Sequence, residues 1–172
     1  PLAAHARAQA VAAAERLGRL QPGNDFSAPL MVAVAVDLAQ ANAGTTAREL
    51  LERTLRLEPD CEPALLSLGF SFERAGEHQQ AVATYQRLVE LRPDHHEGRL
   101  RLALNLIRTG RPRDGEEGLR GLLGAGTPTW VATLAAQELV RLLIAEERLE
   151  AAEEAARVAL LRTPDDQRQW IL

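Results

Sequence analysis

The chain has 172 residues, of which 46% are apolar and only 3% aromatic, and the apolar residues are mostly alanine and leucine. Because alanine and leucine are the best helix formers and β-branched residues are few, we expect an all-helical protein. A net charge of −4 argues against a nucleic-acid surface, and the absence of lysine excludes lysine nucleophiles, Schiff-base lysines and phosphate-loop lysines.

Cys61 is the one cysteine in the sequence, so an intramolecular disulfide and a cysteine-rich metal site are excluded. No apolar run approaches the roughly 18 residues of a membrane-spanning helix, and the sequence as given starts without a secretory signal. We therefore expect no membrane insertion. A cytoplasmic location is expected for the segment as given, while the compartment of the whole protein stays open.

Four prolines each close a helical run that is rich in arginine and leucine. They are Pro22, Pro59, Pro93 and Pro164, and the intervals between them are 37, 34 and 71 residues. The last interval fits two units, with Pro128 near the missing boundary. A period near 34 residues indicates stacked helix–turn–helix repeats rather than a bundle around one core.

The stretch from 60 to 93 is the best-formed unit. Its key positions are Leu65, Leu68, Gly69, Phe72, Gly76, Ala81, Tyr85 and Pro93. Their spacing resembles the tetratricopeptide repeat (TPR), whose pattern is W-x2-L-G-x2-Y, then A-x3-F, then P, although Leu65 and Phe72 replace its Trp and Tyr. The resemblance covers nearly the whole chain and implies an all-α, right-handed α-solenoid of stacked TPR-like repeats.

The expected units in chain order are 1–22, 28–60, 61–94, 95–127, 128–164 and 165–172. The first is the second helix of a partial repeat or, equally, a plain N-terminal capping helix. Four repeats follow it. The last unit is the start of a further helix, or a short solvating cap of the kind that repeat arrays need at their ends.

Within the first two repeats, helix ends and helix crossings are marked by particular residues. Repeat 1 is expected to have its first helix over 28–42. Its second helix is expected to run to Leu57, with Thr45 or Thr46 as the residue that can cap its start. In repeat 2, Asp60 is expected to cap the first helix. Gly69 and Ala81 are expected where the two helices cross, because larger side chains there would force the helices apart.

The last two repeats depart from this regularity. In repeat 3, Gly115, Gly118 and Gly121 fall three apart in the second helix, and each costs up to about 1 kcal/mol relative to alanine. They indicate a soft hinge or a face that another backbone approaches closely, or else a drifted repeat that its neighbours hold in place. In repeat 4, the first helix, about 128–146, is expected to be one turn longer than the others, and the second covers about 149–162.

Few residues suggest catalysis. The side chains of His95 and His96 diverge by about 100° on a helix and cannot converge as zinc ligands at i and i+4 do. Cys61 lies near an expected helix start, which can lower a thiol pKa, but no histidine is near it in the sequence. We therefore expect no enzymatic activity, no cofactor and no metal.

The resemblance also implies a concave groove, because ligand contacts in the family come from first-helix residues that do not face their partner helix. The corresponding residues here are Val32, Val36, Leu66, Phe70, Glu73, Leu100, Leu104, Ile107, Arg108, Gln137 and Arg141. TPR co-chaperones that bind acidic chaperone tails use lysines, an arginine and asparagines at such places. Because most equivalents here are apolar, a carboxylate clamp of that kind is not expected.

An apolar strip edged by Glu73, Arg108 and Arg141 suits an amphipathic helix or an apolar extended peptide. The alternative is that neighbouring repeats fill the groove and these side chains belong to the core. The sequence thus predicts a non-enzymatic scaffold that binds a protein or peptide partner. It leaves open a regulatory or substrate-presenting module of a larger enzyme, such as a transferase, and self-association through the repeat ends.

Overall fold

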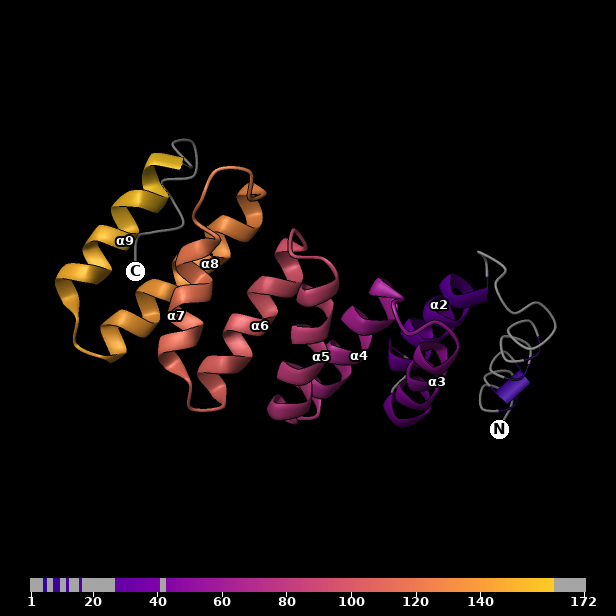
Figure 1. The fold of residues 1–172 in the computed structure, drawn as a ribbon. Helices are drawn as coiled ribbons and strands as arrows, with labels where there is room; N and C mark the ends of the chain where they lie inside the picture. Colours follow the sequence, from indigo (N-terminus) through magenta and orange to yellow (C-terminus); the bar gives the residue numbers. More distant parts are fainter. Residues whose placement is uncertain are drawn as a thin grey trace. The chain divides into compact units, whose positions relative to one another are not determined.

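The computed structural model describes residues 27–40 and 43–162, together with the single residues 5, 8, 9, 12 and 16. In this part of the chain every regular element is an α-helix (Figure 1). The helices are α2 (Ser27–Gln40), α3 (Gly44–Leu57), α4 (Glu62–Arg74), α5 (His78–Leu91), α6 (His96–Arg108), α7 (Pro112–Gly121), α8 (Thr129–Ala145) and α9 (Leu149–Arg162). The predicted terminal unit 165–172 lies outside the described residues. So does the predicted unit 1–22, apart from those five single residues.

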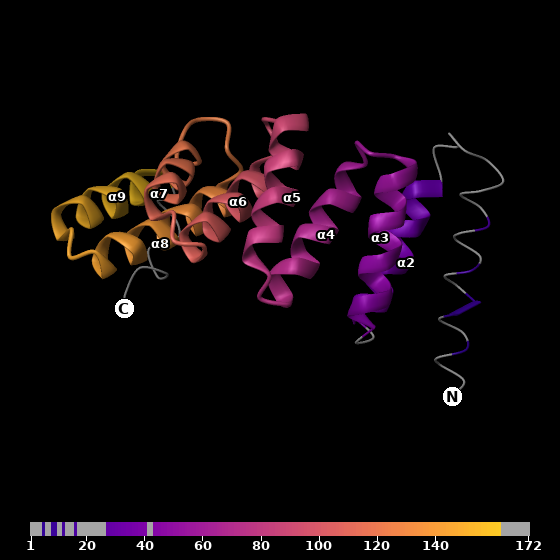
Figure 2. The same ribbon diagram turned by 60° about the horizontal axis from the view of Figure 1, so that its bottom comes forward.

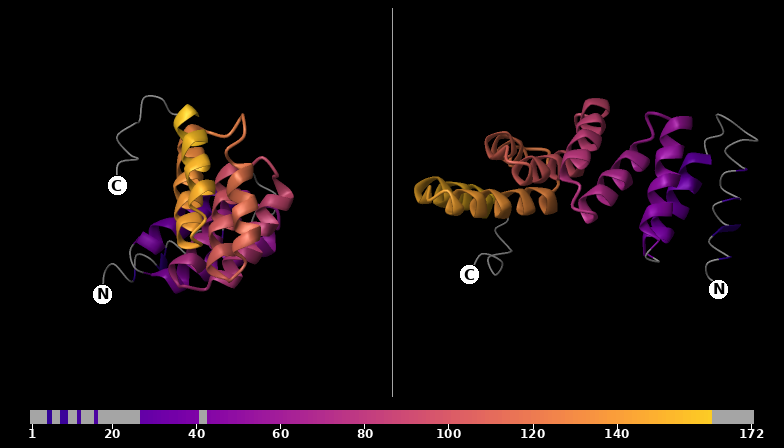
Figure 3. Two further views of the ribbon diagram at one scale, coloured as in Figure 1. Left: turned by 90° about the vertical axis from the view of Figure 1, so that its left-hand side faces the viewer. Right: turned by 90° about the horizontal axis from the view of Figure 1, so that it is seen from below.

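The helices pair as hairpins, and the chain divides into unit 1, residues 1–91, and unit 2, residues 92–172. In unit 1, α2 packs against α3 and α4 packs against α5, and both α2 and α3 contact α4 (Figure 2). In unit 2, α6 packs against α7 and α8 against α9, and both α6 and α7 contact α8 (Figure 3). The expected all-α fold of stacked helix–turn–helix repeats is confirmed, whereas the repeat boundaries stay a prediction.

No helix in the described ranges is long and apolar enough to cross a membrane. The length predictions for repeat 4 agree with the structure, since α8 has 17 residues and α4 and α6 have 13 each.

Two predicted helix caps are wrong. α3 begins at Gly44 after Ala43, so Thr45 and Thr46 already lie in its first turn, and no side chain caps it. The N-cap of α4 is Cys61 rather than Asp60, again without a side-chain hydrogen bond. The carboxylate of Asp60 instead lies 3.9 Å from the guanidinium of Arg87 on α5.

The two helices of repeat 2 approach closely at Gly69, as predicted. A Cβ atom at Gly69 would lie 2.9 Å from Cδ1 of the fully buried Tyr85 and nearer still to other atoms of its ring. Ala81 is also fully buried. The small residue on α4 therefore makes room for the ring on α5.

The three glycines of α7 face α6. A Cβ atom at Gly115 would lie 2.7 Å from the backbone oxygen of Ala103 and even closer to Ile107 Cγ1. At Gly118 it would lie 3.0 Å from Cβ of Ala103, and at Gly121 3.0 Å from Nη2 of Arg99. Of the alternatives raised by the sequence, these contacts favour close approach of another backbone, and that backbone is the other helix of the same hairpin.

The turns inside three hairpins use left-handed backbone. Gly76 and Gly110 have φ of 75° and 81°, which glycine adopts without steric cost. The turn between α8 and α9 places Glu147 at φ 58° instead, so the last hairpin tolerates a residue with a side chain where the two before it use glycine.

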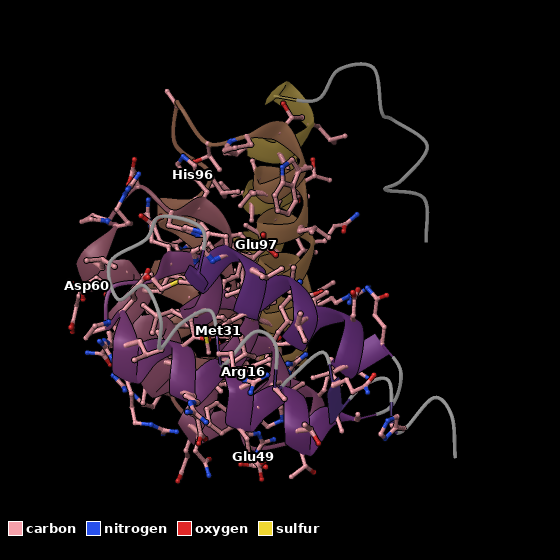
Figure 4. The ribbon with its side chains drawn as sticks, turned by 90° about the vertical axis from the view of Figure 1, so that its right-hand side faces the viewer. Arg16, Met31, Glu49, Asp60, His96 and Glu97 are labelled. Atoms are coloured by element: carbon pink, nitrogen blue, oxygen red, sulfur yellow. The ribbon has the colours of Figure 1, made fainter. Side chains whose placement is uncertain are left out.

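Each unit has its own apolar core. In unit 1 buried side chains of α2, α3 and α4 pack together, among them Met31, Leu38, Leu51 and Leu68. Figure 4 shows Met31 in the interior of this unit and the exposed Glu49 at its edge. In unit 2 the core joins residues of α6, α7, α8 and α9.

Glu116 on α7 is the centre of an ion-pair network in unit 2. Its carboxylate accepts hydrogen bonds from Arg148 Nη1 at 2.7 Å and Nη2 at 3.1 Å, and from Arg120 Nε at 3.0 Å. Arg148, helped by Arg120, lowers the pKa of the Glu116 carboxyl below its ordinary value of 4.5, against the opposing effect of burial. The network ties α7 to the turn before α9.

Replacing Gly115 with alanine tests the close contact between α6 and α7. Alanine normally stabilises a helix interior by up to about 1 kcal/mol relative to glycine. Overpacking against Ala103, however, destabilises the fold by about 1–3 kcal/mol. We expect a net loss of about 1–2 kcal/mol in urea unfolding followed by circular dichroism. Gly44→Ala is the control, because no atom would lie within 4 Å of its new Cβ. Equal stabilisation by both substitutions would contradict the close contact.

Glu116→Gln tests the ion-pair network. Because the folded carboxyl has a lowered pKa, its stabilising effect is present above pH 4.5 and is lost as the pH falls through the folded pKa. We expect the variant to lose up to about 1 kcal/mol at pH 7 and to match the wild type once both are well below pH 4. Glu153→Gln is the control, since Glu153 pairs with Arg157 on an exposed surface. A pH-independent difference would argue against the ion pair.

Candidate partner-binding site

Unit 1 contains a hollow between α2, α3 and α4 with a cavity volume of about 640 Å³. We call it the α2–α4 hollow. Its lining residues are Ala35, Val36, Ala39, Gln40, Gly44, Thr45, Ala47, Arg48, Leu51, Leu66, Ser67, Phe70, Ser71, Arg74 and Ala75. The volume lies within the range of sites that bind ligands of moderate size.

The hollow exists because alanines line it where the helices meet. Ala35 on α2 and Ala47 on α3 are buried, and Ala39 is half-buried. Methyl groups at these positions keep the backbones close but do not fill the space between the helices. Larger side chains border the hollow instead: Val36 is 39% exposed and Phe70 is 36% exposed, so both offer apolar surface to a ligand.

α4 supplies the hollow with a row of side chains at i, i+4 and i+8. They are Leu66, Phe70 and Arg74, which fall on one face of a helix. The other face of α4 carries the buried Leu65, Leu68 and Gly69. Since that face is used for packing, the row is left to face the hollow.

Arg48 of α3 forms one wall of the hollow and fixes it to α4. Its Nη1 lies 2.8 Å and 3.0 Å from the two carboxylate oxygens of Glu77, and its Nε lies 3.4 Å from Ser71 Oγ. The guanidinium carbon also lies 4.6 Å from the centre of the Phe72 ring, a distance at which the ring face attracts a cation. One side chain thus connects α3, α4 and the turn before α5.

The candidate groove residues of unit 1 divide into two groups. Val36, Leu66 and Phe70 all line the α2–α4 hollow. Val32 is only 8% exposed and belongs to the core, so its expected place in a groove is wrong: it faces the packed side of α2. Glu73 is half-buried and is not among the lining residues.

In unit 2 the structure corrects the prediction for Leu100. This residue is 3% exposed and packs in the core with residues of α7 and α8, so it has almost no surface for a ligand. Leu104 and Ile107 are half-buried and pack against the same core. Ile107 in addition lies against Gly115. Arg108 is exposed at the end of α6.

α8 places the remaining candidates on one helix face. Gln137 is half-buried, and Arg141 is exposed and pairs with Glu138 at 2.9 Å. The same face carries Trp130, 53% exposed, together with Leu134 and Ile144, which are also exposed. These five residues follow the helical spacing of four and three. The repeat pattern gave no reason to choose Trp130 and Leu134, because they precede its first conserved position.

Sequence reasoning also missed the part of the hollow that α3 forms. Residues of the second helix, above all Arg48, were not considered because the family pattern takes ligand contacts from first helices. The small residues at 43–47, which precede Arg48, are a sequence signal for a hollow at this part of α3. The pairing of Arg48 with Glu77 has no such signal, because the two residues are 29 positions apart.

The described residues show no metal-binding group of three or more His, Cys, Asp or Glu side chains. Burial raises the pKa of the Cys61 thiol above its ordinary value, despite an opposing hydrogen bond from the backbone of Ala64. The lowered thiol pKa considered from the sequence is therefore wrong. His95 is the N-cap of α6, where its Nδ1 accepts a hydrogen bond of 2.9 Å from the Gly98 backbone N–H.

Replacing Arg48 with glutamine tests its role as the wall of the hollow. The variant loses the ion pair with Glu77 and the contact with the Phe72 ring, so we expect unfolding free energy to fall by about 1–2 kcal/mol. Arg56→Gln, an exposed arginine of the same helix, should change it by less than about 0.5 kcal/mol. In a double-mutant cycle, Glu77→Gln should add little once Arg48 is gone; full additivity would contradict the pairing.

Residues 63–95 match the family model of the tetratricopeptide repeat. No curated protein matches the sequence. The fold is similar to a crystal structure of MamA, with a TM-score of 0.75, 16% identity, and 93% of this chain and 90% of that chain covered. It is also similar to residues 41 to the end of MamA from Desulfovibrio magneticus RS-1, with a TM-score of 0.70, 16% identity, and 96% and 91% covered.

A tetratricopeptide repeat protein from Parabacteroides merdae ATCC 43184 gives a TM-score of 0.73 at 16% identity, with 96% of this chain and 63% of that chain covered. At these identities the likeness is one of fold. The family match falls on α4 and α5, the hairpin whose residues carried the resemblance. The chain therefore carries a tetratricopeptide repeat at residues 63–95, and its fold is that of tetratricopeptide-repeat proteins.

Proposed function

We propose that the protein is a non-enzymatic interaction scaffold that binds a segment of a partner protein in the α2–α4 hollow. The observation that carries the proposal is the convergence of Val36, Leu66 and Phe70, three of the expected groove residues, on one accessible apolar hollow. The fold supports the same function, because stacked helical repeats present extended surfaces that suit peptide segments.

The size and lining of the hollow favour a few apolar anchors. Full burial of a leucine or phenylalanine side chain is worth about 1.5–3 kcal/mol. A micromolar complex needs about 8 kcal/mol net of the entropy cost of binding, so two or three anchors together with backbone hydrogen bonds are required. An amphipathic helix or an apolar extended segment supplies anchors at suitable spacing.

We further propose that the exposed face of α8 is a separate partner-binding surface of unit 2. Gln137 and Arg141 lie there beside Trp130, Leu134 and Ile144. Aromatic and arginine side chains are those that most often dominate binding energy at interfaces. Leu104, Ile107 and Arg108 on α6 supply less apolar surface to a ligand, because the two apolar side chains are half-buried.

Phe70→Glu tests the hollow as the binding site. A carboxylate at this position would be desolvated by an apolar anchor, so we expect capture of the partner to fall at least about tenfold, a change of about 1.4 kcal/mol. A photo-crosslinking amino acid at position 70 should label the same partner. Leu57 is the matched control, since it is an exposed apolar residue of unit 1 outside the hollow.

Leu57→Glu should leave capture unchanged, and a crosslinker at position 57 should not label the partner. Circular dichroism establishes that both variants keep their helices. If Phe70→Glu keeps its helicity and captures as much partner as the wild type does, the hollow is refuted as the binding site.

A further inference from the structure

The charges around the α2–α4 hollow restrict what can occupy it. Two of its lining residues carry charge, Arg48 and Arg74, and both are cationic. The nearby acidic residues Asp37 and Glu73 are not among the lining residues. The hollow therefore presents an apolar surface with positive charge at its border.

The two arginines are not equivalent. Arg48 is held by the carboxylate of Glu77 and by Ser71, so its charge is already balanced. Arg74 is exposed at the end of α4, and in the described part of the chain it has no ion pair. A cation beside apolar surface disfavours basic ligands and favours a carboxylate.

The helix geometry fixes how far the carboxylate lies from the apolar anchor. Phe70 and Arg74 are four residues apart on α4, so their Cβ atoms are about 5–6 Å apart on the same face. An extended chain advances about 3.3 Å per residue, and a helix returns to the same face after three or four residues. An acidic residue of a bound peptide can therefore reach Arg74 while the peptide's apolar anchor contacts Phe70. In an extended peptide the acidic residue is two residues from the anchor, and in a helical peptide it is three to four residues away.

From this geometry, and resting on the proposed function, we propose that the occupant of the hollow is a protein segment with an apolar anchor and an acidic side chain two to four residues from it. The anchor packs against Leu66 and Phe70, and the acidic side chain pairs with Arg74. Ser67, Ser71 and Gln40 at the border offer hydrogen bonds to the segment's backbone.

Selection from a random twelve-residue peptide library against the full chain tests this inference. Enriched peptides should contain an aliphatic or aromatic residue with Asp or Glu two to four positions away. Fluorescence anisotropy with one such labelled peptide should give about threefold weaker binding to Arg74→Gln and about tenfold weaker binding to Arg74→Glu. Repeating the selection on Arg74→Glu should replace the acidic residue with a basic one.

Arg113→Glu is the matched control. Arg113 is an exposed arginine of unit 2 that does not line the hollow, so its reversal should leave affinity unchanged. This inference would be overturned if the selected peptides were apolar without an acidic residue, and if they bound Arg74→Glu but not Phe70→Glu. That result would leave the proposed function standing. No enrichment, or binding that Phe70→Glu does not alter, would overturn both.

Discussion

The close approach of the two helices within a hairpin is the constraint on which the rest of the structure depends. In repeat 2 it is possible because Gly69 has no side chain where the Tyr85 ring lies. In repeat 3 the same requirement is met by Gly115 against the backbone of Ala103. Glycines at crossings are costly in an isolated helix, so the packing that they permit has to offset that cost.

This constraint also explains where the hollow lies. One face of α4 is committed to α5 and to the core, so Leu66, Phe70 and Arg74 are left on the opposite side. Alanines on α2 and α3 keep those helices near α4 without filling the space. Arg48 lies at one wall of the hollow, and its contacts to Glu77 and Phe72 fix the position of α3 relative to α4.

Much of the fold could be predicted from the sequence, because a repeat places prolines, glycines and small crossing residues at fixed intervals. The site was predicted only in part. Whether Val36 or Val32 is accessible depends on the rotation of α2 about its axis, which the core decides, and Leu100 was misplaced for the same reason. The wall formed by Arg48 depends on Glu77, and no local pattern links residues 29 apart.

The dominance of packing between sequence neighbours has a consequence for how the chain acquires its structure. In both units each helix makes its main contacts with a helix adjacent to it along the chain, which gives a low contact order. Such topologies fold quickly, because little loop-closure entropy is lost before native contacts form. A hairpin can therefore form during synthesis as soon as its second helix has left the ribosome. Residues 62–91, which carry the close crossing at Gly69, are suited to be a nucleus on which neighbouring hairpins assemble.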